Sequence, residues 1–224
     1  MTQQAKTLET QITKTVRLNY LLHRPPDYDP GKQFPLILFL HGRDERGDDV
    51  EILKRHGMPK LLVEKPDFPF MVVSPQCPAD SDWSVEMDGV IALLDHIALN
   101  YAVDLSRVYL TGLSMGGRGA YQLAAMQPQR FAALVPICGP RPDVLRREER
   151  MRGLIHLPIW IFHGALDSIV AVDESTKIAD GLKSLGGNVR LTIYPDLKHN
   201  SWQRTYENPE LFAWMLQHKN VGRG

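Results

Sequence analysis

The chain has 224 residues, enough for one domain with a substantial core. Its 26 Lys and Arg residues balance 26 Asp and Glu residues, and this balance gives no indication of a surface for nucleic acid or an anionic membrane. A hydrophobic content of 43% with 23% charged residues is typical of a soluble globular protein.

The N-terminal stretch MTQQAKTLETQITKTVRL lacks the long apolar core of a signal peptide. No stretch of the sequence reaches the roughly 18 apolar residues that span a bilayer. We therefore expect a cytoplasmic protein, unless a leader segment has been removed. Cys77 and Cys138 form at most one pair, which does not indicate a disulfide framework. We expect a single domain over residues 1–224, with residues 1–14 as a peripheral segment.

Short apolar runs alternate with helical stretches along most of the chain. The runs are mostly continuous, as in strands covered on both faces. The expected strands are 15–22, 36–40, 70–74, 108–111, 134–138, 159–163 and 189–194. The expected helices are 85–100, 120–127, 173–185 and 209–218. This order predicts an α/β fold with a mostly parallel, doubly wound sheet, helices on both faces, and ligands bound beyond the carboxyl ends of the strands.

The segment 139–157 joins two of the predicted strands. It contains RREERMR, whose interleaved charges are typical of an exposed helical face. The segment is too short to form a large lid domain. We therefore expect an open site.

A glycine-rich stretch, GLSMG at 112–116, joins a predicted strand to a predicted helix. It matches G-x-S-x-G, in which the serine sits on a sharp turn with its hydroxyl raised above the sheet edge. The flanking glycines remove Cβ atoms that would collide in such a bend. A serine in such a turn can also simply cap the following helix. The catalytic interpretation of Ser114 therefore requires a base, an orienting acid and an oxyanion site elsewhere.

Histidine suits the role of the base, because its pKa lies close to working pH. The chain has eight histidines, at positions 23, 41, 56, 96, 156, 163, 199 and 218. His41 and His163 each end an apolar strand and precede glycine, which favours a structural role in the floor of the site. His199 lies in YPDLKHNSW, a loop after the last predicted strand, where it can fold back over the nucleophile. The sequence therefore predicts His199 as the base.

The orienting acid should also follow a strand. Asp167, in IFHGALDSIV, does so directly. Asp173 opens a predicted helix as an N-cap, and Asp196 is too close to His199 in sequence to reach the far side of its imidazole. With Asp167, the order along the chain is serine, acid, histidine, the order of the α/β-hydrolases.

The developing oxyanion needs hydrogen-bond donors. One expected donor is the backbone N–H of Met115, the residue after the nucleophile, and the other is that of Arg43 in the loop LFLHGRDERGDD. The alternative is that HGRDERG is only a polar loop with internal salt bridges.

Five segments together make the chain similar to the α/β-hydrolase superfamily. They are LILFLHGRDERGDD, FPFMVVSPQCP, RVYLTGLSMGGRGAY, PIWIFHGALDSIV and YPDLKHNSW. The chain most resembles the small carboxylesterases without a lid, including the phospholipase/carboxylesterase and feruloyl-esterase-like groups, some of them named as peptidases. The resemblance covers residues 15–216 and implies an α/β-hydrolase fold without a large lid, with Ser114, Asp167 and His199 as the triad and the amides of Arg43 and Met115 as the oxyanion hole.

Trp202 resembles an aromatic residue that, in this group, often follows the histidine and packs against its loop. Two other places differ from the pattern of the family. Arg43 and Asp44 stand where relatives carry small residues. This difference would alter the turn of the loop, or the guanidinium of Arg43 would attract a carboxylate or phosphate of the substrate. Arg118 stands where an aromatic residue is common.

These observations predict a serine hydrolase that cleaves small carboxylic esters through an acyl-enzyme on Ser114, with no metal and no organic cofactor. A peptidase or thioesterase with the same triad is the alternative, and a non-catalytic binding protein with this fold is a further one. Trp83, Trp202 and Arg43 are expected to contact the substrate. Cys138 is expected to be a buried structural cysteine, with a reactive thiol near the site as the alternative. Acyl and alcohol specificity and the oligomeric state are not indicated.

Overall fold

The computed structural model describes residues 3–11, 13–220 and 222. Residues 1, 2 and 12 of the expected peripheral segment, and residues 221, 223 and 224 of the expected domain, lie outside the described residues. The strands are β1 (Asn19–His23), β2 (Phe34–Leu40), β3 (Met71–Gln76), β4 (Val103–Leu113), β5 (Ala133–Ile137), β6 (Ile159–Gly164) and β7 (Val189–Tyr194). The α-helices are α1 (Gly57–Glu64), α2 (Met87–Asn100), α3 (Met115–Met126), α4 (Glu148–Arg152), α5 (Asp173–Ser184), α6 (Trp202–Glu207) and α7 (Pro209–Leu216). Short 3-10 helices are η1 (Arg43–Glu45), η2 (Val50–Arg55), η3 (Pro128–Arg130) and η4 (Asp143–Arg146).

The strands form one sheet in the order β1-β3-β2-β4-β5-β6-β7. Only the β1–β3 pair in this described sheet is antiparallel, and the other neighbours run parallel. The mostly parallel, doubly wound sheet predicted from the sequence is therefore confirmed.

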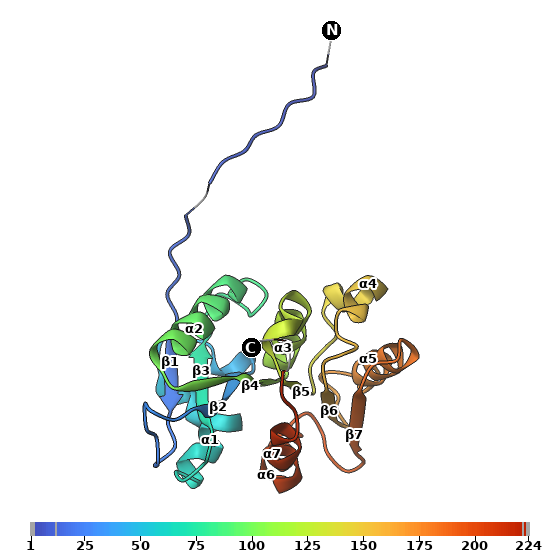
Figure 1. The fold of residues 1–224 in the computed structure, drawn as a ribbon. Coiled ribbons are helices and arrows are strands. Elements are labelled where there is room, and N and C mark those ends of the chain that lie inside the picture. Colours follow the sequence, from blue (N-terminus) through green and yellow to red (C-terminus); the bar gives the residue numbers. More distant parts are fainter. Residues whose placement is uncertain (1–2, 12, 221, 223–224) are drawn as a thin grey trace.

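Helices cover both faces of this sheet (Figure 1). Alternate side chains of β2 divide between two cores: Leu38 faces the core beneath α2, α3 and α5, whereas Phe39 faces the core beneath α1, α6 and α7. Every residue of β2 is buried. Burial on both faces is why the strand reads as a continuous apolar run rather than an alternating one.

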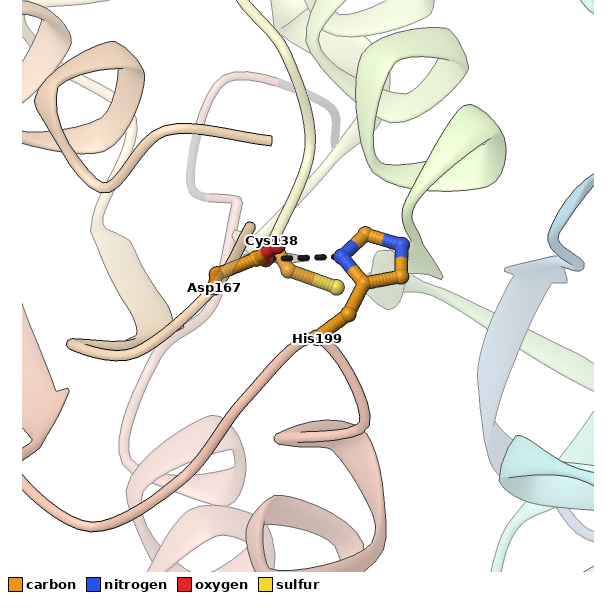
Figure 2. A group of neighbouring side chains, drawn as sticks. All are labelled: Cys138, Asp167 and His199. Atoms are coloured by element: carbon orange, nitrogen blue, oxygen red, sulfur yellow. Dashed lines mark hydrogen bonds and ion pairs between the residues drawn. The ribbon is translucent and has the colours of Figure 1, made fainter. Parts of the chain in front are cut away.

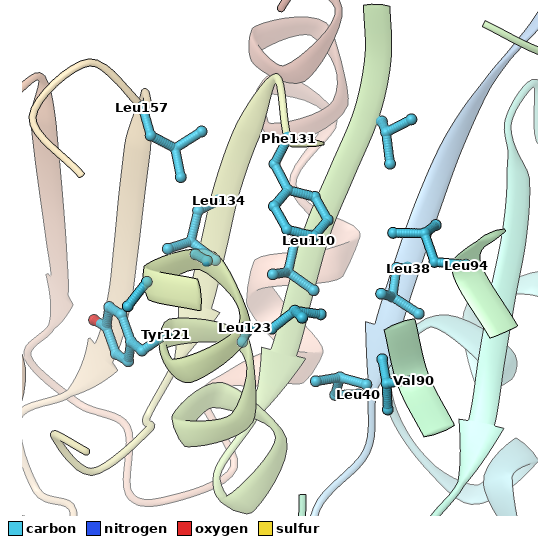
Figure 3. Packing of buried hydrophobic residues seen from close by; sticks show 14 of the residues in the cluster. Leu38, Leu40, Val90, Leu94, Leu110, Tyr121, Leu123, Phe131, Leu134 and Leu157 are labelled. Atoms are coloured by element: carbon cyan, nitrogen blue, oxygen red, sulfur yellow. The ribbon is translucent and has the colours of Figure 1, made fainter. Parts of the chain in front are cut away.

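The larger core lies between the sheet and α2, α3 and α5, and Figure 3 shows its centre. Leu38 and Leu110 from neighbouring strands meet Val90 of α2 and Leu123 of α3 there. Each of these side chains is fully buried. At roughly 1.5–3 kcal/mol for each large apolar side chain, this packing holds the sheet rigid beneath the loops at its carboxyl edge.

Several boundaries differ from the sequence expectations. α3 begins at Met115 rather than at residue 120, because helix geometry starts directly after Ser114 and includes the glycines that lower helix propensity. α1 was not predicted, since GMPKLLVE contains a glycine and a proline near its start, where proline is tolerated. The charge run at 146–152 includes α4, with Met151 as its buried residue, which fits the expected exposed helical face.

Among the described residues, no helix combines the length and the apolar character needed to cross a bilayer.

Candidate active site

The carboxyl ends of four strands meet at one edge of the sheet and carry the predicted site residues. Ser114 directly follows β4, Asp167 follows β6, and His199 lies in the turn after β7. Arg43 opens η1 after β2. This is the edge at which parallel sheets bind ligands.

Ser114 occupies a strained turn between β4 and α3. Its φ of +52° and ψ of −115° are rare for a residue with a side chain, and such strain costs on the order of 1–3 kcal/mol. A Cβ atom added at Gly112 would overlap the carbonyl of Gly116, and one added at Gly116 would overlap the carbonyl of Leu40. The Ser114 N–H donates to the carbonyl oxygen of Ile137 at 2.9 Å, which ties the turn to β5. The glycines therefore permit a bend that presents the hydroxyl at the sheet edge.

Two hydrogen bonds connect the three predicted triad residues. Oγ of Ser114 lies 2.9 Å from Nε2 of His199. Nδ1 of the same imidazole lies 2.7 Å from Oδ2 of Asp167. Nδ1–H donates to the carboxylate, which leaves Nε2 free to accept the proton of the hydroxyl. This arrangement can pass a proton from serine to histidine while the carboxylate fixes the imidazole.

The side chain of Asp167 is fully buried and has several hydrogen-bond donors. Its Oδ1 accepts from the backbone N–H groups of Ile169 and Val170, both at 2.9 Å. Burial alone would raise the pKa of Asp167. The hydrogen bonds from His199 and from these two N–H groups outweigh burial, and the pKa of this carboxyl lies below its ordinary value. Asp167 is therefore a carboxylate at neutral pH, as the predicted orienting role requires.

The two strand-end histidines lie in the floor of the site. Nδ1–H of His41 donates to the carbonyl oxygen of Gly42 at 2.6 Å, and Nε2 accepts from the N–H of Cys77 at 2.9 Å. Burial lowers the pKa of His41 to about 4. His163 is also buried, with Nδ1 2.7 Å from Oγ of Ser175. Both imidazoles are buried, whereas the side chain of His199 is partly exposed.

Cys138 follows β5 and lies beside Asp167 and His199 (Figure 2). It is fully buried, with a φ of +42°, and burial raises the pKa of its thiol to about 12. Ligand atoms of Cys138, Asp167 and His199 lie within 4.8 Å of one another, so this is the one group in the described part of the chain that could hold a metal ion. The bond between Asp167 and His199 already occupies an oxygen and a nitrogen that such an ion would need. The donor set therefore fits a proton relay better than a metal centre.

A cavity of about 240 Å³ opens above Ser114. Its lining includes His199 and Trp202, together with η1 and the preceding Gly42. Ile169, which is 74% exposed, forms part of the rim. Among the described residues that line this cavity, none comes from the segment 139–157. The mouth is therefore formed by short loops.

The two residues with expected oxyanion donors both lie near Ser114. Met115 is the first residue of α3, so its amide is at the helix N-terminus, where N–H groups favour negative charge. Arg43 lines the cavity from η1, and its side chain is exposed. Arg43 and Asp44 replace the small residues that relatives carry at the start of η1. This turn is nevertheless closed by a hydrogen bond, in which the Arg46 N–H donates to the Arg43 carbonyl oxygen at 3.4 Å.

The two tryptophans predicted as substrate contacts have different positions. Trp202 lines the cavity and packs edge-on against His199, with ring centroids 5.5 Å apart at 88°. Trp83 is 1% exposed and lies beneath the site, where its Nε1–H donates to the carbonyl oxygen of His41 at 2.9 Å. Because the indole of Trp83 is enclosed in the core, the prediction that it contacts the substrate is wrong.

Three cavity residues were missed in the sequence: Glu45, His56 and Ile169. Glu45 lies in the charged loop RDERGDD, which reads as solvated surface, yet its side chain is only 3% exposed. His56 precedes the unpredicted α1 and packs edge-on against Trp202 at 5.8 Å. No local pattern distinguishes these residues, because they are brought to the cavity by the fold rather than by a motif.

Comparison with known proteins identifies several related chains. The model described as the Dienelactone hydrolase family matches residues 80–210. Bifunctional acetylxylan esterase/xylanase XynS20E of Neocallimastix patriciarum is 26% identical over 80% of this chain and 26% of its own length. Acylamino-acid-releasing enzyme 2 of Oryza sativa subsp. japonica is 23% identical over 62% of this chain and 23% of its own length. The chain thus spans about a quarter of each of these two relatives.

Solved structures that are similar over nearly the whole chain include an esterase. The crystal structure of a thermostable esterase superposes with a TM-score of 0.76 at 33% identity, covering 91% of this chain and 60% of that one.

Proposed function

Because this chain belongs to the dienelactone hydrolase family of the α/β-hydrolase superfamily, we propose that it is a serine esterase acting on small carboxylic esters. The observation that carries the proposal is the continuous hydrogen-bonded series from Ser114 through His199 to Asp167, at 2.9 and 2.7 Å. The series lies at the bottom of an open cavity. The similarity to a thermostable esterase and to an acetylxylan esterase supports esters as the substrate class.

In the proposed reaction, Oγ of Ser114 attacks the ester carbonyl while Nε2 of His199 takes the hydroxyl proton. The Asp167 carboxylate holds the imidazole in the required tautomer and stabilises the imidazolium. The amides of Arg43 and Met115 donate to the oxyanion. The imidazolium then protonates the leaving alcohol. Water, deprotonated by His199, releases the acid from the acyl-enzyme and restores the Ser114 hydroxyl.

Trp202 and Arg43 are the proposed substrate contacts in this cavity. The half-buried indole of Trp202 offers an apolar wall beside His199, which suits an acyl or aryl group. The exposed guanidinium of Arg43 stands at the mouth, where it can attract an anionic group on the substrate.

The experiment compares hydrolysis of p-nitrophenyl acetate by the parent and by Ser114→Ala. The account expects the variant to lose turnover by on the order of 10⁴ or more. Ser184→Ala, at the exposed end of α5, is the matched control and keeps the parent rate. Equal rates for the parent and Ser114→Ala would refute the proposal.

The same residues could cleave an amide or a thioester instead. The similarity to an acylamino-acid-releasing enzyme supports amide cleavage as the second candidate. Matched ester, thioester and anilide substrates with one acyl group separate these possibilities through kcat/KM. The proposal expects the ester to be preferred, and a preference for the anilide would favour the second candidate.

A further inference from the structure

A second acid, Glu45, lies beside the proposed oxyanion site. It ends η1, the turn that begins with Arg43, and it lines the same cavity as Ser114 and His199. Its side chain is only 3% exposed. The proposed mechanism assigns it no role. A buried carboxyl is costly unless its charge is compensated, so its partners determine what it can do.

The imidazole of His41 does not compensate this carboxyl. Nδ1 of His41 is 3.8 Å from Oε2 of Glu45, beyond hydrogen-bonding distance. Both ring nitrogens are already engaged with backbone groups, of Gly42 and Cys77. Burial lowers the pKa of His41 to about 4, so the ring is neutral at physiological pH.

The remaining charged groups around Glu45 act in opposite directions. Nε2 of His56, at the start of α1, is 3.9 Å from Oε1, and burial together with Lys60 lowers the pKa of this imidazole. Asp44 adds a negative charge from the same turn, and Arg55 of η2 adds a positive one. Burial is the largest effect and raises the pKa of Glu45 to about 7, against the opposing influence of backbone N–H groups and Arg55.

The carboxyl packs directly beneath the turn that leads to Arg43. A Cβ atom added at Gly42 would lie 3.2 Å from Oε2 of Glu45 and 2.8 Å from Cδ1 of Leu113. The main chain of Glu45 is fixed by Gln76, whose Nε2 donates to the Glu45 carbonyl oxygen at 3.0 Å. Glu45 therefore supports the backbone segment that presents the Arg43 amide to the cavity.

We propose that Glu45 is a positioning residue of the Gly42–Arg43 turn and that it supports turnover as the neutral carboxylic acid. Ionised Glu45 places a second negative charge next to the developing oxyanion, inside a cavity where charges are weakly screened. The inference rests on the proposed esterase function. It adds an alkaline limit to the activity, set by a residue outside the triad.

The test is the pH dependence of kcat for p-nitrophenyl acetate between pH 5 and 9, in the parent, Glu45→Gln and Glu51→Gln. Glutamine keeps the size of the side chain and cannot ionise. Glu51 is an exposed acid of η2 that pairs with Lys54 outside the cavity, so Glu51→Gln controls for a loss of charge.

We expect kcat of the parent and of Glu51→Gln to fall about tenfold above pH 7, with KM little changed, whereas kcat of Glu45→Gln stays level. A purely structural role would lower the activity of Glu45→Gln equally at every pH. A decline that persists in Glu45→Gln, or a parent without any decline, would overturn the inference. A parent that hydrolyses no ester at any pH would instead overturn the proposed function.

Discussion

Nε2 of His163 lies 3.1 Å from Oδ2 of Asp167, the same oxygen that accepts from His199. The same nitrogen is 2.9 Å from the carbonyl oxygen of Val170. Because both oxygens only accept, Nε2 of His163 carries a proton and donates. The carboxylate is thus held between two imidazoles, one buried and one facing Ser114.

Ser175 fixes this second imidazole, since its Oγ is 2.7 Å from Nδ1 of His163. In Ser175→Ala, the free energy of unfolding should fall by about 1–2 kcal/mol, because Nδ1 of the buried His163 loses its hydrogen-bond partner. The value of kcat should also fall several-fold, as Asp167 becomes less well oriented. Thermal unfolding and steady-state kinetics check both effects. Ser184→Ala, on the exposed part of the same helix, should change neither.

Asp167→Asn should lower kcat by on the order of 10⁴, because the amide favours the wrong tautomer of His199. The matched control is Asp196→Asn. Asp196 also precedes His199, but its carboxylate pairs with Arg204 on the surface, at 2.7 and 2.8 Å. Ester hydrolysis by Asp196→Asn should stay within a few-fold of the parent. Similar losses in the two variants would contradict the assignment of Asp167.

Gly116→Ala should destabilise the protein by about 3 kcal/mol or more, since its Cβ would overlap the carbonyl of Leu40. For a chain of this size the melting temperature should fall by roughly 6–12 °C. Gly153→Ala provides the comparison, because the nearest atom to its added Cβ is Arg150 O at 3.4 Å and its backbone is helical. Calorimetry should find that control unchanged or slightly more stable. An unaltered melting temperature for Gly116→Ala would show that the turn is not as tight as described.

The buried Glu45 carboxyl should make stability depend on pH. Burial raises its pKa from an ordinary 4.5 to about 7 in the folded protein. Below pH 4.5 the acid is protonated in both states, so its contribution is fully present. As pH rises to 7 the unfolded chain ionises first, and the free energy of unfolding falls.

Relative to Glu45→Gln, the parent should therefore lose about 2–3 kcal/mol of stability between pH 4.5 and 7.5. Urea unfolding at several pH values measures this difference. The neighbouring His41, with its pKa lowered to about 4, is common to both proteins and cancels in the comparison. Parallel pH curves for the two proteins would contradict the burial of an uncompensated carboxyl.

The fold and the candidate triad could be predicted because each depends on a local pattern. Continuous apolar runs indicated strands buried on both faces, and Ser114, Asp167 and His199 each follow such a run. The position of Trp83 could not be predicted. Its neighbours in PADSDWSV are polar, and its burial depends on His41, far away in sequence. Glu45 was missed for the same physical reason, since it lies against His56 and Gln76, which are not its neighbours in sequence, although the local sequence presents it as solvated.

The most direct test of the central claim is to treat the protein with a fluorophosphonate probe and map the adduct by peptide mass spectrometry. A serine activated by His199 displaces fluoride from this probe and is phosphonylated, whereas ordinary surface serines do not react. The account predicts one probe per chain, attached to Ser114, and no labelling of Ser114→Ala. An adduct on another residue, or an unlabelled parent protein, would contradict it.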